Sequence, residues 1–442
     1  MKRVLFIATV TEHINAFHLP YLKWFKAQGW ETHVATRGDG DILYCDKKHN
    51  LSIERSPFRL GNLKTYFELK SILRKEKFDI IHGHTPMGGM LARFCGSKYR
   101  QKSIFETENN ISADSAKSPY TRIIYTAHGF HFYKEASLIN WFLYYPIEKF
   151  LSRYTDDLIT INHEDYGLAK RKMKAKHVHY VPGVGVNTNK FLSFGDLQSA
   201  NDDMNAISLP SQLRVSKRKE FGIPEDATVL ISVGELNKNK NHGVVIKALA
   251  QLKNNDFDNN DEHCHSESQV NNNNNTDNLY YVICGSGTLH NDLRTLAQKL
   301  HIQDRVLFLG QRDDIAELLN MSDIFIFPSL REGLPVSLME AMASGLPCIA
   351  SSIRGNVDLI AHEKGGLLIK TEKSSTATNS NPVSGYANAI KSLIDDESLR
   401  KRLGKHNQDV VKQFDINVVM KQMQEIYLQS PEETNHDRQK NL

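Results

Sequence analysis

The sequence predicts an α/β protein of two domains, each built around a doubly wound parallel sheet. Three observations indicate this class. The chain of 442 residues is too long for one ordinary α/β core. Short apolar runs alternate with amphipathic helical stretches, which is the pattern of parallel strands joined by helices. The alternation stops at the segment VPGVG, residues 181–185, and then restarts, so this segment is predicted to be the hinge.

The first domain is predicted to occupy residues 1–184. It opens on the apolar run 4–9, which suits a buried strand and lacks the cleavage site of a signal peptide. Further strands are predicted at residues 31–35, 78–82, 122–127, 157–161 and 177–181, with helices at 16–28, 63–77, 87–94 and 138–154. Ligands of such sheets bind beyond the carboxyl ends of the strands, so the loops after strands are the places to expect function.

The second domain is predicted to occupy residues 185–414. Its strands are expected at residues 228–233, 279–284, 306–309, 324–327 and 347–350, and its helices at 242–252, 288–300, 315–320, 336–344 and 385–394. A last helix within residues 415–430 follows the completed second sheet. We expect this helix to pack back on the first domain.

Three polar stretches interrupt the pattern, at residues 102–119, 254–278 and 370–384, and a polar tail follows residue 430. The stretch 254–278 is rich in Asn and is predicted to be a disordered surface insertion. Its triplet His263-Cys264-His265 could bind a metal adventitiously, but a solvated low-complexity loop is the simpler interpretation.

Composition excludes several classes of protein. A net charge of +4 is too small to indicate a nucleic-acid partner. No stretch has the roughly 18 apolar residues of a membrane span, so a cytoplasmic location is expected. The five cysteines are scattered without a CxxC pair, which disfavours a disulfide framework or a zinc site.

The most informative segment is FPSLREGLPVSLMEAMASGLP, residues 327–347. A strand is followed by a turn with Gly333 and Leu334, by a proline suited to a first helical position, and by a helix that begins near Val336 and ends at Gly345. The free amides of its first turn, together with the helix dipole, form an anion site suited to a pyrophosphate.

Two carboxylates accompany this anion site. Glu332 lies in the loop before the helix, and Glu340 lies inside it. Carboxylates accept hydrogen bonds from sugar hydroxyls, so Glu332 is predicted to meet a transferred sugar and Glu340 a ribose diol. The alternative is that both are ordinary surface acids, but the strand–Gly–Pro–helix–Gly–Pro context favours the functional interpretation.

The spacing of Glu332 and Glu340 resembles the E-x7-E signature of the retaining glycosyltransferases of family 4. That resemblance implies a GT-B fold, in which two Rossmann-like domains face each other across a cleft. It extends over nearly the whole chain apart from the polar insertions. HTPMGG at 84–89 and YYPIE at 144–148 resemble the subgroup that builds bacterial exopolysaccharide and capsule units.

Further segments match the donor-binding parts of that family. SVGELNKNKNH at 232–242 resembles its first phosphate-binding turn, CGSG at 284–287 its second glycine turn, and GQRDD at 310–314 the segment that faces the base. The resemblance therefore assigns donor binding to Gly234, Lys238, Lys240, Gly285, Gly287 and Arg312, beside Gly333, Leu334, Val336 and Glu340.

One position departs from the family pattern. Many members have Arg after the glycine of the first phosphate turn, whereas this chain has Glu235. A carboxylate beside a pyrophosphate would be repulsive, so Glu235 is expected to point elsewhere, to a hydroxyl or to Lys238. Lys240 matches the family's lysine and should carry more of the phosphate charge, although a solvated turn is the alternative for both lysines.

The first domain contributes its own candidates. YTAHGFHFY at 125–133 resembles the family's active-site loop, which makes His128 a catalytic candidate that reaches the transferred sugar; a structural histidine is the alternative. His13 and Asn15, after the first strand, are predicted on the acceptor side or in a simple loop role. Asp39-Gly-Asp41 is interpreted as a turn and not as a metal-binding DxD.

The resemblance implies transfer of a hexose or N-acetylhexosamine, with retention, from a nucleotide diphosphate sugar, by default a UDP-sugar. No cofactor and no metal are expected, and the acceptor is expected to be lipid-linked or a saccharide. The basic run 170–176 and the aromatic run 141–145 suggest a peripheral contact with the inner face of the cell membrane, although a solvated helix end and core packing are equally good interpretations.

Two other functions stay open. A sugar-nucleotide epimerase of similar fold would need no acceptor, and a non-catalytic sugar-nucleotide-binding partner would bind without turnover, as Glu235 hints. A dehydrogenase is disfavoured because the first strand is not followed by G-x-G-x-x-G.

Overall fold

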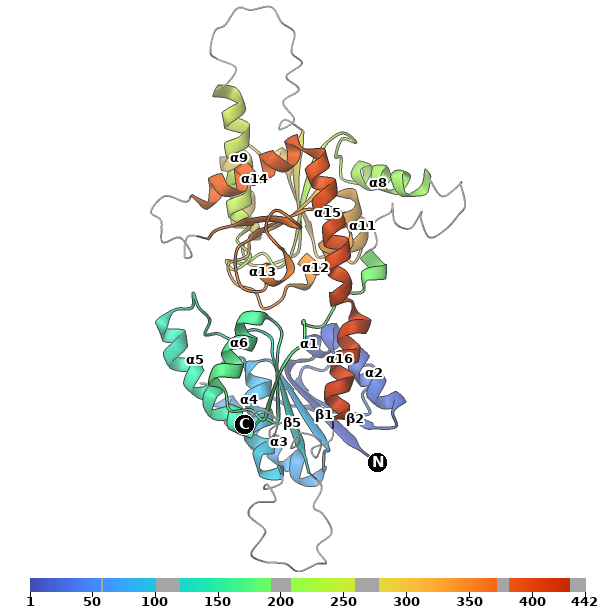
Figure 1. Ribbon diagram of the computed structural model, residues 1–442, viewed down its shortest axis with the longest axis vertical. Helices are drawn as coiled ribbons and strands as arrows, with labels where there is room; N and C mark the ends of the chain where they lie inside the picture. Colours follow the sequence, from blue (N-terminus) through green and yellow to red (C-terminus); the bar gives the residue numbers. More distant parts are fainter. Residues whose placement is uncertain (57–58, 101–119, 192–207, 259–277, 372–380, 430–442) are drawn as a thin grey trace, which may run out of the picture. The chain divides into compact units, whose positions relative to one another are not determined.

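The computed structural model describes the chain except for residues 57–58, 101–119, 192–207, 259–277, 372–380 and 430–442. The described chain divides into two compact units (Figure 1). Unit 1 contains Met1–Val184 together with the segment from Val419, and unit 2 contains Gly185–Val418. Much of each predicted polar insertion, and the tail, lie outside the described residues.

Unit 1 is built on a seven-stranded parallel sheet with the order β3-β2-β1-β4-β5-β6-β7. The strands are β1 (Arg3–Val10), β2 (Glu31–Arg37), β3 (Lys47–Asn50), β4 (Ile80–His84), β5 (Arg122–Ala127), β6 (Asp157–Thr160) and β7 (His177–Tyr180). The helices are α1 (Thr11–Phe17), α2 (Leu19–Ala27), α3 (Gly61–Lys75), α4 (Pro86–Gly96), α5 (Leu138–Leu151) and α6 (His163–Lys172). β1 and β4 lie at the centre, which explains why the sequence of β1 is almost continuously apolar.

The last helix, α16 (Ile416–Leu428), places its apolar face in the core of unit 1. Val419, Met423 and Ile426 are buried there among side chains of β1 and α2. Tyr427 is fully enclosed, and its hydroxyl lies 2.8 Å from Nδ1 of His82 on β4. The helix therefore covers one face of the first sheet although it follows the second sheet in the sequence (Figure 1).

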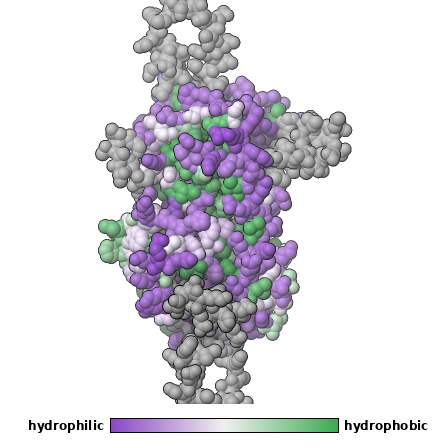
Figure 2. Space-filling model, viewed as in Figure 1, coloured by the Kyte–Doolittle hydropathy of each residue, from purple (hydrophilic) through white to green (hydrophobic). Residues whose placement is uncertain are grey.

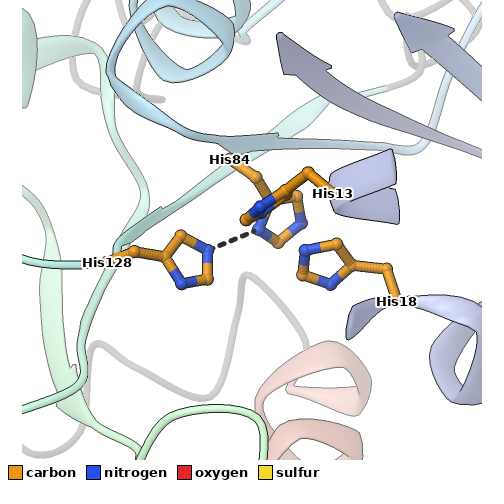
Figure 3. A group of neighbouring side chains, drawn as sticks. All are labelled: His13, His18, His84 and His128. Carbon is orange, nitrogen blue, oxygen red and sulfur yellow. Dashed lines mark hydrogen bonds between the residues drawn. The ribbon is translucent and has the colours of Figure 1, made fainter. Parts of the chain in front are cut away.

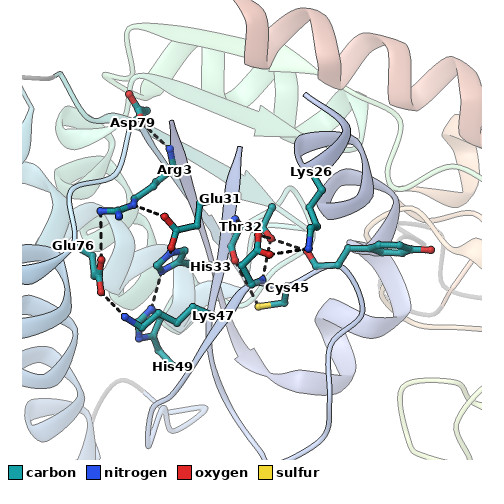
Figure 4. A network of polar contacts seen from close by, with 12 residues as sticks. Arg3, Lys26, Glu31, Thr32, His33, Cys45, Lys47, His49, Glu76 and Asp79 are labelled. Carbon is teal, nitrogen blue, oxygen red and sulfur yellow. Dashed lines mark hydrogen bonds and ion pairs between the residues drawn. The ribbon is translucent and has the colours of Figure 1, made fainter. Parts of the chain in front are cut away.

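Polar contacts join the amino-terminal ends of the central strands (Figure 4). Arg3 of β1 donates from Nε to Glu31 of β2 at 2.6 Å, and Glu31 also lies 2.9 Å from Nε2 of His33. The amide of Arg3 donates to Asp79, just before β4, at 2.7 Å. Ligands of such sheets bind at the carboxyl ends of the strands. These polar contacts therefore stabilise the opposite edge of the sheet.

Unit 2 is built on a six-stranded parallel sheet with the order β10-β9-β8-β11-β12-β13. The strands are β8 (Thr228–Val233), β9 (Leu279–Cys284), β10 (Val306–Gly310), β11 (Ile324–Phe327), β12 (Cys348–Ser351) and β13 (Gly366–Ile369). The helices are α8 (Ser208–Glu220), α9 (His242–Asp258), α10 (His290–Lys299), α11 (Ile315–Met321), α12 (Val336–Ala343), α13 (Asn356–Leu359), α14 (Pro382–Asp395) and α15 (Glu397–Val411). Apolar residues of α9 and α14 pack with strands β8, β9 and β12 in one core.

Several elements differ from the sequence-based prediction. The helix predicted at 16–28 corresponds to α2 and the last two residues of α1, which begins earlier, at Thr11. The two helices meet at His18, where the backbone leaves the helical region (φ −121°, ψ −1°). Strands β3 and β13 were not predicted, since KKHN is wholly polar and GLLI adjoins a polar insertion. Helices α6, α8 and α15 were also missed, because their sequences are mostly polar.

Candidate active site

The start of helix α12 lies in unit 2, after the carboxyl end of β11. Pro335 precedes its first residue, Val336, with an extended backbone (φ −77°, ψ 123°), and no side chain caps the helix. The first-turn amides have no acceptor within the helix, because the preceding turn that would supply one is absent. The helix ends at Ala343, and Gly345 follows the C-cap residue with a φ of +74°, which suits glycine. Anion binding at this helix start stays a prediction.

Lys240 and Glu332 meet in front of this helix. The Nζ of Lys240 lies 2.7 Å from Oε1 of Glu332, and both side chains are largely buried, at 19% and 14% exposed. The two loops are also joined by their backbones, since Leu330 N–H donates to Asn239 O at 2.8 Å. Asn239 returns a side-chain bond of 3.0 Å to the carbonyl of Arg331. Residues 92 positions apart in the sequence thus form one charged pair at the carboxyl edge of the sheet.

Glu340 is half-buried on α12, and its carboxylate has no hydrogen-bond partner among the described residues. Burial raises the pKa of Glu340 to about 6, and the positive charge of Lys190 opposes that rise. A partly desolvated carboxylate without a donor gains from any ligand hydroxyl that reaches it. This is the condition that a diol-binding residue should meet.

The two glycine turns interlock through their backbones. Gly285 has φ +143°, and a Cβ on it would lie 1.9 Å from the carbonyl oxygen of Gly234. A Cβ on Gly287 would lie 2.4 Å from the carbonyl oxygen of Leu236, whose amide donates to Ser286 O at 2.9 Å. The close approach of the two turns therefore requires glycine at 285 and 287.

Three other residues of the predicted donor segments have different surroundings. Glu235, which was expected to point away from the donor, is exposed and accepts a 2.9 Å bond from the side chain of Asn237, so it does not pair with Lys238. Lys238 is exposed at the tip of the turn. Arg312 forms two bonds with Asp314, at 2.8 and 2.6 Å, and its guanidinium is therefore already engaged by a carboxylate.

In unit 1, His128 belongs to a cluster of four histidines that includes His13, His18 and His84 (Figure 3). His13 lies on α1, His18 between α1 and α2, His84 at the end of β4, and His128 directly after β5. The Nε2 of His128 lies 3.4 Å from Nδ1 of His84, and the rings of His18 and His84 are 3.8 Å apart. We call this group the histidine cluster.

Burial keeps the imidazoles of the histidine cluster neutral. It lowers the pKa of His13 to about 4 and that of His128 to about 3. The pKa values of His18 and His84 are also held well below the usual value, first by burial and then by the neighbouring histidines. His128 is therefore a neutral hydrogen-bonding group at physiological pH.

Sequence analysis identified His13 and His128 but not His18 or His84. The sequence could have indicated His84 as a site residue, because it is the last residue of a buried strand and lies at the carboxyl edge of the sheet, next to the end of β5. Asn15, the other predicted acceptor-side residue, is exposed and donates to the carbonyl of Asp41 at 3.1 Å. Asn15 thus stabilises the loop that contains Asp39-Gly-Asp41 and does not belong to the histidine cluster.

A buried ion pair lies beside the strand that carries His128. Arg93 of α4 is completely enclosed and donates to Glu148 of α5 from both terminal nitrogens, at 2.7 and 3.2 Å. Its guanidinium carbon lies 3.8 Å from the ring centre of Tyr125 on β5. A Cβ on Gly89 would lie 2.1 Å from the same ring. The segments 84–89 and 144–148 singled out in the sequence therefore pack against β5.

Two parallel-sheet units, one with interlocked glycine turns and a Lys–Glu pair before an open helix end, have the architecture of the GT-B fold class. Family models agree with this class. "Glycosyl transferases group 1" matches residues 214–410, and "Glycosyl transferase 4-like" matches residues 3–107. The chain belongs to this glycosyltransferase family.

Individual relatives support the assignment. The chain is 37% identical over 430 residues to the putative glycosyltransferase EpsD of Bacillus subtilis, covering 96% of each chain. It is 28% identical to an Escherichia coli enzyme named UDP-Gal:alpha-D-GlcNAc-diphosphoundecaprenol alpha-1,3-galactosyltransferase, over 84% of this chain and 80% of that one. The Anabaena protein Alr3699/HepE, solved with UDP and glucose, has the same fold, with a TM-score of 0.67 at 16% identity over 97% of this chain and 99% of its own.

Proposed function

We propose that the chain is a retaining glycosyltransferase that moves a hexose or N-acetylhexosamine from a UDP-sugar to a lipid-linked or saccharide acceptor in exopolysaccharide assembly. One observation carries the proposal: the Lys240–Glu332 pair lies before the open start of α12, whose own Glu340 has no hydrogen-bond partner among the described residues. The names of relatives support the substrate classes, since one acts from UDP-Gal on a diphosphoundecaprenol acceptor and a structural neighbour binds UDP.

In this proposal the donor diphosphate lies at the start of α12. The amides of its first turn and Lys240 meet the charge that grows on the leaving group, and Lys238 adds a long-range attraction. Glu332 accepts hydrogen bonds from the transferred sugar and Glu340 from the ribose. These groups supply the charge stabilisation, so the donor phosphates need no metal.

The transfer step follows from family resemblance and balances without a further reactant. The bond between the anomeric carbon and the diphosphate oxygen breaks, and the acceptor oxygen bonds to the same face of that carbon. The acceptor's proton passes to the departing diphosphate. His128, as a neutral imidazole, offers one hydrogen bond to a hydroxyl of the transferred sugar.

The test is a donor screen by mass spectrometry, with a polyprenyl-diphosphate-linked sugar as acceptor. We expect the acceptor to gain the mass of one hexose or N-acetylhexosamine from a UDP-sugar, with the anomeric configuration of the donor. Added Mg²⁺ or Mn²⁺ should not be required. A donor that is rearranged or hydrolysed equally without acceptor would favour the epimerase, and calorimetric donor binding with no product would favour a non-catalytic partner.

The ionisation of Glu340 predicts a pH dependence of donor binding. Its carboxyl is ionised above a pKa of about 6, and protonation removes the acceptor that the ribose needs. Lowering the pH from about 7 to about 5 should therefore weaken donor affinity roughly tenfold, since about one group in ten stays ionised one unit below the pKa. Isothermal titration with UDP would measure this. A Glu340→Gln variant should lack this component, and equal pH profiles in the two proteins would contradict the assignment.

A peripheral membrane contact would bring the enzyme to a lipid-linked acceptor. None of the described helices is long and apolar enough to cross a membrane. Helix α5, however, exposes Leu138, Ile139 and Phe142 by 75%, 74% and 80%, which forms an apolar patch on the surface (Figure 2). In the predicted aromatic run, Trp141 and Tyr145 are instead half-buried against the core, so only Phe142 points outward.

Basic residues accompany this patch in the same unit. Five exposed basic side chains occupy the end of α6 and the loop after it, namely Lys170, Arg171, Lys172, Lys174 and Lys176. Near anionic lipid each contributes about 1 kcal/mol, and the apolar side chains of α5 would enter the interface. We therefore propose that unit 1 binds anionic membranes through α5, assisted by these cations.

Replacing Leu138, Ile139 and Phe142 together by Ser should reduce binding to vesicles of anionic phospholipid about tenfold or more. Vesicle sedimentation measures the bound fraction, and 1 M salt should weaken the wild-type contact. Leu213→Ser, which changes a 45%-exposed leucine of unit 2, is the matched control and should bind as the wild type does. Unchanged binding of the triple variant would exclude α5 as the contact.

A further inference from the structure

We infer that the histidine cluster of unit 1 is a binding site for a divalent transition metal, with Zn²⁺ as the ion that fits its chemistry. Each of His13, His18, His84 and His128 offers one ring nitrogen, and these four atoms all lie within 4.8 Å of one another. In a tetrahedral zinc site with bonds of about 2.0–2.1 Å, neighbouring nitrogens are about 3.3 Å apart. Small shifts of the side chains would therefore bring the four nitrogens to bonding distance.

The fold explains why the four rings converge. Strands β1, β4 and β5 are neighbours in the parallel sheet, so their carboxyl ends meet at one edge. His84 ends β4, His128 follows β5, and α1 begins directly after β1. The break between α1 and α2 then turns His18 toward His84 (Figure 3). The four ligands thus stand on four places of a rigid frame and not on one loop.

The state of the nitrogens is the second observation. The Nε2 of His13, both ring nitrogens of His18 and the Nε2 of His84 are buried and have no hydrogen-bond partner among the described residues. Buried polar atoms are normally paired, so several unpaired nitrogens in one cluster need an explanation. A metal ion supplies it, because a neutral imidazole binds a metal through the lone pair that is otherwise unused.

The donor set indicates the class of ion. Four imidazoles suit Zn²⁺, Cu²⁺ or Ni²⁺ and do not suit Mg²⁺ or Ca²⁺, which prefer oxygen ligands. His18 and His84 are each 1% exposed, whereas His13 and His128 are half-buried, so the site is enclosed on one side and open to entry on the other. Since Mg²⁺ prefers oxygen ligands, an Mg²⁺ ion bound with a nucleotide is not expected to occupy the histidine cluster.

The inference does not rest on the proposed sugar transfer, and its test needs neither donor nor acceptor. The four residues belong to unit 1, whereas the groups proposed to hold the donor diphosphate belong to unit 2. A bound metal would also fix the ring of His128. No metal was expected from the sequence, in which the four histidines are spread from position 13 to position 128 without a ligand-spacing motif.

The experiment uses the full chain with His263→Asn, Cys264→Ser and His265→Asn, which removes the other metal-binding triplet noted in the sequence. The chain is purified without metal and titrated with Zn²⁺ against a chromophoric chelator, and Co²⁺ is added separately. We expect one equivalent of Zn²⁺ per chain and the strong visible absorption of four-coordinate Co²⁺.

Variants in this background decide which residues bind. His13→Asn, at a half-buried position, should weaken Zn²⁺ binding by more than about a hundredfold, which is the upper end of the loss for a residue outside the ligand set. His84→Asn should do the same, and circular dichroism confirms that each variant is folded. His163→Asn changes an exposed histidine of the same unit and should bind as the background does. Substoichiometric binding, or equal affinity in the His13 variant and the control, would overturn the inference.

Discussion

Glu340→Gln is expected to lower kcat/KM for sugar transfer by roughly a hundredfold or more without unfolding the protein. The carboxylate of Glu340 is partly desolvated and has no hydrogen-bond donor among the described residues. The carboxylate can therefore accept hydrogen bonds from both hydroxyls of a ribose. Two hydrogen bonds to a charged acceptor at about 1.5–3 kcal/mol each correspond to a factor of 10² to 10⁴.

The same carboxylate should not be needed for folding. Its pKa is raised in the folded chain to about 6, above the value of 4.5 for an unperturbed group. The ionised form is therefore less stable in the folded chain than in the unfolded chain, so neutral Gln should leave the stability at pH 7 unchanged or raise it by up to about 2 kcal/mol.

Steady-state transfer kinetics and thermal unfolding together test the role of Glu340. Glu225→Gln, at an exposed position of the same unit, is the matched control and should change neither quantity. His128→Ala should lower kcat with less effect on UDP affinity, since His128 is assigned to the transferred sugar. Full activity of the Glu340 variant in a folded protein would remove this residue from the donor site.

The sequence predicted the two-sheet architecture because a parallel sheet leaves a strong pattern. Its central strands are buried on both faces, so β1, β8 and β11 are nearly continuous apolar runs. Edge strands lack that pattern. In β3 the two end residues are exposed and the two middle residues half-buried, and its Lys and His side chains are what an edge strand tolerates. The sequence pattern of four polar residues could not distinguish β3 from a loop.

The candidate site likewise has features that the sequence predicts and features that only the fold reveals. Glu332, Gly333 and Glu340 belong to one continuous strand–turn–helix segment, so the sequence holds the whole signal. The Lys240–Glu332 pair and the contact of Gly285 with Gly234 depend on how two loops meet, which only the fold determines. The histidine cluster is the extreme case, since its members lie on four separate elements. Glycine at 285 was assigned to the nucleotide, whereas packing between the turns also requires it.

The ion pair of Arg93 and Glu148 yields the largest expected effect on stability. Glu148→Ala should destabilise unit 1 by about 3–5 kcal/mol, because it leaves a fully enclosed guanidinium without its carboxylate. Arg93 would retain one hydrogen bond, from Nε to Gly89 O at 2.9 Å, and the face of Tyr125. Neither neutralises its charge. The loss should loosen the contact of α4 and α5 with β5, the strand that leads to His128.

Unit 1 can be followed separately from unit 2 during urea unfolding. The three tryptophans, Trp24, Trp30 and Trp141, all belong to unit 1, so tryptophan fluorescence reports on this unit alone. Replacing both partners, as Arg93→Met with Glu148→Leu, should recover part of the stability lost in Glu148→Ala, because no charge is then left unpaired. Glu397→Ala, which breaks an exposed i,i+4 pair with Lys401, is the control and should leave the tryptophan transition unchanged. A Glu148→Ala transition that coincides with the wild-type transition would mean that water reaches the guanidinium, and the pair could then not be what holds α4 and α5 beside β5.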